Sequence, residues 1–191
     1  ARGGLGSLSG GPDGAICLAD ADILASTFTL CSLSKYTSTT NRERIIRGRD
    51  KNWLHGHWSG YTGVAAYDYD QAGFQTSSDS GLPSSSTAGV IDDGDWLMFC
   101  GQNGGGGYIR ANGVTVATTT TGVGNESVCV NYLSGERSDW AVGEIITWNY
   151  ALSLDEIQEA EAHLGSRFAL TWIPTPVPSP APTQLPTPMP T

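Results

Sequence analysis

Proline occupies nearly every second position from Pro174 to Pro190, in the run PTPVPSPAPTQLPTPMP. Proline fixes its φ angle and has no backbone N–H, so such a run cannot enter the interior of a helix or sheet. Residues 173–191 are therefore predicted to form an extended polyproline II tail, which would reach roughly 50 Å at about 3.1 Å per residue. Any hydrophobic core must come from the residues before this tail.

Short β-type segments separated by turn residues fill most of the remaining chain. Glycine, serine and threonine are abundant, with 25 glycines among 191 residues. The expected strands are 26–33, 42–48, 52–58, 63–69, 95–102, 107–113, 114–120, 127–133 and 140–150. Many short strands at close spacing predict an all-β fold, an antiparallel two-sheet sandwich or jelly roll. The glycine-rich residues 1–14 are expected to form a flexible or wrapped N-terminal leader.

A single short C-terminal helix is predicted in LSLDEIQEAEAHLG (152–165). Ser153 and Glu156 have the spacing of a capping box, and Leu152 and Ile157 that of a hydrophobic staple. An apolar stripe follows at helical spacing, and Gly165 stands where a left-handed C-cap is expected. We expect this helix to pack on the edge of the sandwich.

The formal charge of −9 disfavours nucleic-acid binding, which needs clustered cations. The one basic cluster alternates with Ile45 and Ile46, and it consists of Arg42, Arg44, Arg47, Arg49 and Lys51. We interpret it as the solvated face of a strand, with an anion site as the alternative. The sequence lacks a run of eighteen apolar residues, so no membrane span is expected.

Four cysteines, Cys17, Cys31, Cys100 and Cys129, are consistent with two disulfides. Three pairings are possible, and free thiols in a reducing compartment are the alternative.

Asn125 begins an Asn-Glu-Ser glycosylation acceptor next to a glycine. The sequence starts at Ala1 rather than methionine, which suggests a processed chain. Together these features favour a secreted, extracellular protein.

Aromatic residues gather in the segment 53–69, where Trp53, Trp58, Tyr61 and Tyr67 are candidates for glycan stacking or for an interface. Strand alternation places aromatic residues on both faces of the sheet. The alternative is therefore that the aromatic residues of one face belong to the core. His55 and His57 share one face of a strand, but no third zinc ligand is identifiable. We expect these two imidazoles to stack in an aromatic surface strip or to hydrogen-bond across strands.

Acidic residues suggest no catalytic pair. Glu144 is expected to pair with an arginine or to face solvent, and no catalytic residue is assigned. Calcium is the only cofactor considered, at two acidic clusters made of Asp68 and Asp70 and of Asp92, Asp93 and Asp95. The alternative for these aspartates is turn formation, so no metal site is assigned.

The segments RIIRGRDKNWLHGHWSG and DWLMFCGQNGGGGYIRANGVTV resemble the concanavalin A-like jelly roll, in particular the laminin-G-like modules. The resemblance is strongest in SDWAVGEIITWNYALSLDEIQEAEAHLGSRF, where a closing strand runs into a Leu-Ser-x-x-Glu helix start. It covers roughly residues 15–170 and implies two stacked antiparallel sheets with long loops on one rim. Such modules serve as lectins, adhesion domains, glycosidases and structural spacers, so no single function follows. The Glu-x-Asp-x-x-Glu strand of the glucanases with this fold is absent here.

The tail is similar to the hydroxyproline-rich and mucin-like stalks of extracellular glycoproteins. By that resemblance, O-glycans would be carried by Thr175, Pro176, Pro178, Ser179, Pro180, Pro182, Thr183, Pro186, Thr187, Pro188, Pro190 and Thr191. The expected organisation is a leader (1–14), a jelly-roll domain (15–172) and a glycosylated tail (173–191).

The leading functional hypothesis is a secreted structural glycoprotein that is not an enzyme. Its modules would self-associate through the tail and the leader into a homopolymer, an extracellular fibre or surface coat. The alternative is a carbohydrate-binding adhesion module on a glycosylated stalk, with a polysaccharide as its partner. A hydrolase is the third class considered.

Overall fold

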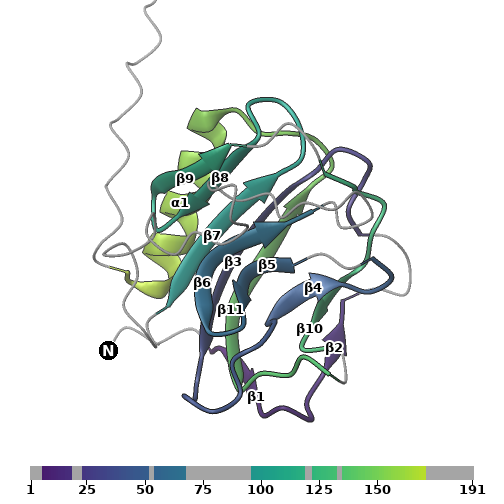
Figure 1. Cartoon of the computed structure of the whole chain (residues 1–191). Helices are drawn as coiled ribbons and strands as arrows, with labels where there is room; N and C mark the ends of the chain where they lie inside the picture. The colour runs from purple at the N-terminus through teal and green to yellow at the C-terminus, as the bar shows by residue number, and fades with distance from the viewer. Residues whose placement is uncertain are drawn as a thin grey trace, which may run out of the picture.

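A computed structural model describes residues 6–18, 23–51, 54–67, 96–118, 122–132 and 135–170. These residues form two stacked antiparallel sheets and one helix (Figure 1). The six-stranded sheet has the order β1 (Leu8–Gly10), β11 (Trp140–Trp148), β3 (Thr29–Tyr36), β7 (Leu97–Gln102), β8 (Tyr108–Ala111) and β9 (Val114–Thr118). The five-stranded sheet has the order β2 (Ile16–Cys17), β10 (Val128–Val130), β4 (Ile46–Gly48), β5 (Leu54–Trp58) and β6 (Tyr61–Ala66). The predicted all-β class with two antiparallel sheets and one helix is confirmed.

The core lies between the two sheets, because inward-facing residues alternate with outward-facing ones along each strand. In β3, Leu30 and Tyr36 belong to this core, whereas Cys31 and Leu33 point to the opposite face. Tyr67 reaches into the core, and its hydroxyl lies over Gly101, where a Cβ would come within 2.0 Å of it. The run Gly104–Gly107 closes the β7–β8 hairpin.

The leader is wrapped onto the domain over its described part. Strand β1 pairs with the N-terminal half of β11. Asn131 Nδ2 donates to the carbonyls of Pro12 at 3.1 Å and Gly14 at 2.8 Å, and Trp140 Nε1 also donates to Gly14 at 3.1 Å. Strands β1 and β2 were not predicted, since runs of three and two residues are too short to show a period.

The helix α1 (Leu154–Phe168) begins with the predicted capping box of Ser153 and Glu156. It packs on the outward face of the six-stranded sheet, over β3 and β7, rather than on the edge of the sandwich (Figure 1). The helix also continues through Gly165, and its left-handed cap is Ala169, with φ of 53°. The extra turn lets Phe168 pack beside Trp96 and against Leu33 of the sheet, which explains why the predicted stop was wrong.

Both ends of the described chain lie beside β11. At one end, Leu8 of β1 is opposite Val142. At the other, the Phe168 ring lies so close to Gly143 that a Cβ there would come within 2.8 Å. In the described residues there is no helix of the length and apolar character needed to cross a membrane.

Candidate functional site

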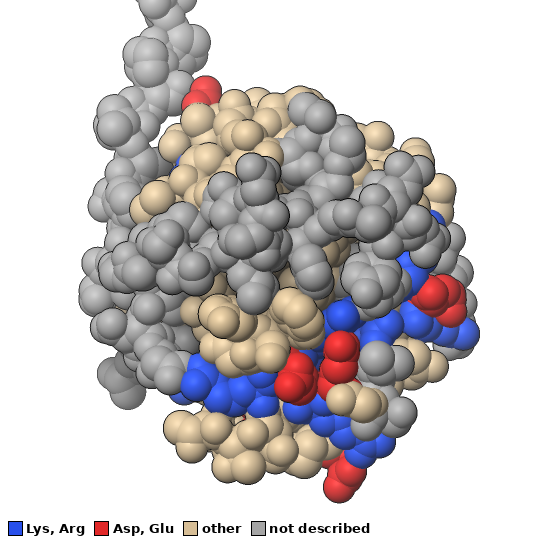
Figure 2. All heavy atoms as spheres, in the orientation of Figure 1, with Lys and Arg blue, Asp and Glu red and all other residues tan. Residues whose placement is uncertain are grey.

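The outward face of the five-stranded sheet is the candidate functional face. The inward faces of both sheets form the core, and α1 covers the outward face of the six-stranded sheet. Figure 2 shows a band of Lys and Arg side chains with interspersed acidic groups across this side of the molecule. We use the name outer face for this surface, which carries Cys17, Arg47, Leu54, Trp58, Tyr61, Val64, Ala66 and Cys129.

Strand register places one row of side chains across the outer face. Cys17 lies opposite Cys129, and Cys129 lies opposite Arg47. Arg47 lies opposite Leu54, and Leu54 opposite Ala66. Directly opposed side chains lie about 5 Å apart at Cβ, so each member of the row contacts the next. The row therefore joins a disulfide, a buried cation and an apolar cluster.

The candidate aromatics divide between surface and core. Trp58 and Tyr61 are cross-strand partners on the outer face; Tyr61 is 41% exposed, and Trp58 packs against Leu54, Val64 and Ala66. Tyr67 is fully buried and makes an edge-to-face contact with Phe28, so its assignment as a glycan or interface residue was wrong. The reason is strand alternation, which turns it inward. Trp53 lies outside the described residues.

The basic cluster is not a solvated strand face, because Arg44 and Arg47 are 3% and 4% exposed. Arg44 forms an ion pair with Glu136 at 2.6 Å. Arg42 lies over the ring of Tyr36 at 4.7 Å and also reaches the carbonyl of Gly60 at 3.4 Å. These partners come from distant segments, which is why the local pattern was misleading.

Arg47 has few partners for a buried cation. Its Nε donates to the Gly48 carbonyl at 2.6 Å, while its buried Nη1 has no hydrogen-bond partner among the described residues. Burial is the main cause that lowers the pKa of Arg47, and the charge of Arg44 adds to it. An arginine remains protonated under such conditions. The outer face therefore contains a positive charge that is only partly compensated.

Glu126 organises the loop after β4 and was not identified from the sequence. Its Oε1 accepts from the backbone N–H groups of Arg49 at 2.9 Å and Asp50 at 3.0 Å, and its Oε2 accepts from Lys51 N–H at 2.7 Å. Lys51 Nζ in turn donates to the Gly124 carbonyl at 2.8 Å. These bonds fix the loop that carries Asn125, whose side chain is exposed.

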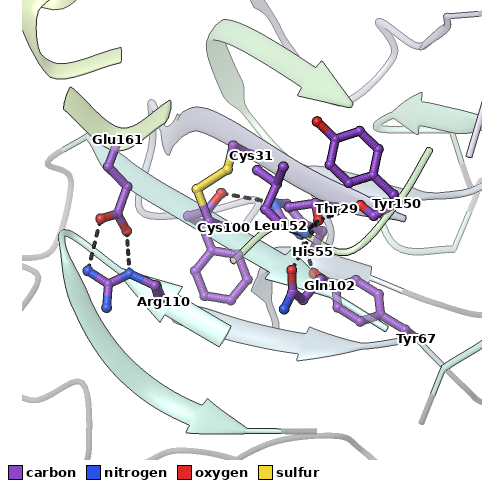
Figure 3. Close-up of a disulfide and its surroundings, with 11 residues drawn as sticks. Thr29, Cys31, His55, Tyr67, Cys100, Gln102, Arg110, Tyr150, Leu152 and Glu161 are labelled. Atoms are coloured by element: carbon purple, nitrogen blue, oxygen red, sulfur yellow. Dashed lines mark hydrogen bonds and ion pairs between the residues drawn. A yellow bond between two sulfur atoms is a disulfide. The ribbon is translucent and has the colours of Figure 1, made fainter. Parts of the chain in front are cut away.

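His55 and His57 point into the core and not into a surface strip, as strand alternation turns both inward. His55 Nδ1 is 2.5 Å from the Tyr67 hydroxyl (Figure 3), and its Nε2 is 3.2 Å from the Phe99 carbonyl. His57 Nδ1 is 3.4 Å from Ser34 Oγ. Burial lowers the pKa of both histidines to about 3. The alternative expectation, hydrogen bonding across strands, is confirmed. Over the ranges described, no three His, Cys, Asp or Glu side chains are grouped so as to hold a metal ion.

Glu144 pairs with an arginine, as expected. Its Oε1 lies 3.0 Å from Arg167 Nη1 and 4.0 Å from His163 Nε2, both on α1. The candidate calcium ligands Asp68, Asp70, Asp92, Asp93 and Asp95 lie outside the described residues, and so do the candidate glycosylation sites of the tail.

The four cysteines form two disulfides, and the structure identifies which of the three possible pairings is present. Cys17 bonds Cys129, and Cys31 bonds Cys100. Each disulfide joins directly opposed residues of adjacent antiparallel strands. Cys31–Cys100 lies under α1 (Figure 3), whereas Cys17–Cys129 lies at the edge strand β2.

The chain matches no known protein-family model, and a comparison with curated proteins gave no match either.

Proposed function

We propose that this chain is a laminin-G-like, concanavalin A-like jelly-roll module of a secreted, glycosylated structural protein. Its modules assemble through the proline-rich tail and the N-terminal leader into an extracellular fibre or surface coat. Two disulfides support an oxidising, extracellular location. Asn125 has an exposed side chain, which supports N-glycosylation because this modification occurs at the protein surface.

The position of the chain ends carries this proposal. Leu8 and Phe168 both contact the N-terminal half of β11. The leader and the proline-rich tail are therefore both attached near the N-terminal half of β11. Modules joined by these segments would project sideways from a common axis. Contacts of one end with the next copy are heterologous, and such contacts build open filaments or rings.

Deleting residues 174–191 is expected to abolish polymers without unfolding the domain, because every core residue described above precedes the tail. Light scattering and electron microscopy of the purified protein give the assembly state, and thermal unfolding reports on the domain. The matched control keeps the tail length but replaces its prolines with serine. Fibres formed by the deletion variant would contradict the proposal.

The second candidate function is carbohydrate binding on the outer face. The Trp58–Tyr61 pair favours it, since adjacent aromatic rings can stack on the apolar C–H faces of sugars. Tyr61 also lies next to Gly60, whose carbonyl accepts from Arg42 Nη2 at 3.4 Å, so a polar group stands beside the ring.

Glycan-array binding is expected to be lost in Tyr61→Ala and Trp58→Ala if this second function holds, with about 1–3 kcal/mol lost per stacked ring by analogy with other ring-stacking sites. Tyr150→Ala is the control, because Tyr150 is 52% exposed but follows β11 on the other sheet. An unchanged array profile in both outer-face variants would exclude this role for the pair.

A further inference from the structure

The two disulfides differ in how an external thiol can reach them. Thiol–disulfide exchange requires a thiolate to approach one sulfur in line with the S–S bond, from the side opposite the sulfur that leaves. Cys17 belongs to β2, the edge strand of the five-stranded sheet, and Cys129 belongs to the next strand inward. Cys17 therefore stands on the side of this disulfide that faces the sheet edge, where the order of the described strands places no further strand beyond β2.

Burial agrees with this direction of approach. Cys17 is partly exposed, and its neighbours Ile16 and Leu18 are 37% and 43% exposed. Cys129 is fully buried. Of the two cysteines, Cys17 is thus the one exposed to solvent, so an external thiolate is expected to attack at Cys17 rather than at Cys129.

The Cys31–Cys100 disulfide has no such open side. Its strands β3 and β7 lie in the middle of the six-stranded sheet. Register places Ile146 beside Cys31 and Arg110 beside Cys100, so both lines of approach are blocked by neighbouring strands. Both cysteines are also buried in the cluster under α1.

Arg47 provides the second requirement, a stabilised leaving group. It is the cross-strand neighbour of Cys129 on the same face, and within the described part of the chain its buried Nη1 has no hydrogen-bond partner. The nearby carboxylates are used elsewhere, since Glu136 pairs with Arg44 and Glu126 accepts from backbone N–H groups of the loop after β4. A cation beside a cysteine favours its thiolate, and a thiolate of lower pKa leaves faster.

We propose that the Cys17–Cys129 disulfide is a thiol-exchange site that takes an external thiol onto Cys17. The thiolate RS⁻ attacks Sγ of Cys17, the S–S bond breaks, and its electron pair goes to Sγ of Cys129. The products are a mixed disulfide RS–S–Cys17 and a Cys129 thiolate beside the Arg47 guanidinium, with no net oxidation. The site does not depend on the structural role proposed above, although it offers that role a point of covalent attachment.

The test incubates the native protein with reduced glutathione and then quenches with an alkylating agent under denaturing conditions. Peptide mass spectrometry is expected to find glutathione on Cys17 and the alkyl group on Cys129, with Cys31–Cys100 intact over the same time. Opening of both disulfides together, an adduct on Cys129, or no opening would each overturn the proposal. The second probe is a folded protein with one exposed cysteine. If this protein also forms an adduct on Cys17, protein thiols can be partners of the site; if only glutathione does, the partners are small thiols.

The role of Arg47 is tested with Arg47→Met, which is expected to slow adduct formation on Cys17 about three- to tenfold. Arg49→Met removes the same charge from the exposed loop and is expected to leave the rate unchanged. If Arg47→Met merely loosened the domain, exchange would become faster and Cys31–Cys100 would open too. An equal or faster rate with Cys31–Cys100 intact would remove Arg47 from the site.

Discussion

Replacing Glu161 with alanine is expected to lower the free energy of unfolding by about 3–5 kcal/mol, because it leaves a buried arginine without its counter-ion. Glu161 of α1 accepts two parallel hydrogen bonds from Arg110 of β8, from Nε at 2.8 Å and from Nη2 at 2.9 Å (Figure 3). The two side chains are only 5% and 4% exposed. Arg110 also donates to Thr115 Oγ1 at 2.7 Å, so the guanidinium is held on several sides. Urea denaturation at neutral pH measures the loss.

Two controls separate the buried charge from general damage to α1. Glu144→Ala removes an ion pair with the same helix, but Arg167 is 44% exposed, so a loss of only about 0–1 kcal/mol is expected. The double variant Arg110→Met/Glu161→Leu removes both charges together and is expected to recover most of the stability. A Glu161→Ala protein as stable as the Glu144→Ala protein would show that the buried pair contributes little.

The parts of this fold that local signals define were predictable from the sequence. The inward alternation of Phe28, just before β3, and Leu30 within it, and the capping box at Ser153, depend on residues within one turn or one strand. The edge strands β1 and β2 depend on distant partners instead. Strand β1 is held by pairing with β11 and by Asn131, and β2 by its disulfide to Cys129.

The burial of charged groups was even less predictable from neighbouring residues than the edge strands were. Arg44, Arg47 and Glu161 stand in stretches that look solvated when only neighbouring residues are considered. The partners of two of them lie far along the chain: Arg44 pairs with Glu136, and Glu161 pairs with Arg110, which is 51 residues away. For the same reason the candidate site was predictable only in part. Trp58 and Tyr61 lie on one face, but the fact that this face also carries a buried cation and a disulfide depends on strand register.

Lowering the pH from 7 to 5 is expected to destabilise the domain by about 4 kcal/mol, about 2 kcal/mol from each of the two buried histidines. Burial is the first cause that lowers the pKa of His55 and His57 to about 3, and for His57 the charges of His55 and Arg42 add to it. In the unfolded chain both take up a proton near pH 6.5. Between pH 6.5 and pH 3 the unfolded state therefore binds more protons, so stability falls as the pH falls through this window. The pKa of Glu43 is raised, mainly by burial, and it acts in the opposite direction.

Urea denaturation at several pH values, combined with NMR titration of the imidazoles, measures this dependence. His57→Phe is expected to halve the loss of stability between pH 7 and pH 5, because it removes one of two groups that must stay neutral. His163→Gln is the matched control, since it removes an exposed imidazole of α1 instead of a buried one. A domain equally stable at pH 7 and pH 5, or imidazole resonances of His55 and His57 that titrate near pH 6.5, would contradict the buried neutral state. If the single substitution His57→Phe removed the whole pH dependence of stability, that dependence would be assigned to His57 and its contact with Ser34 between the sheets.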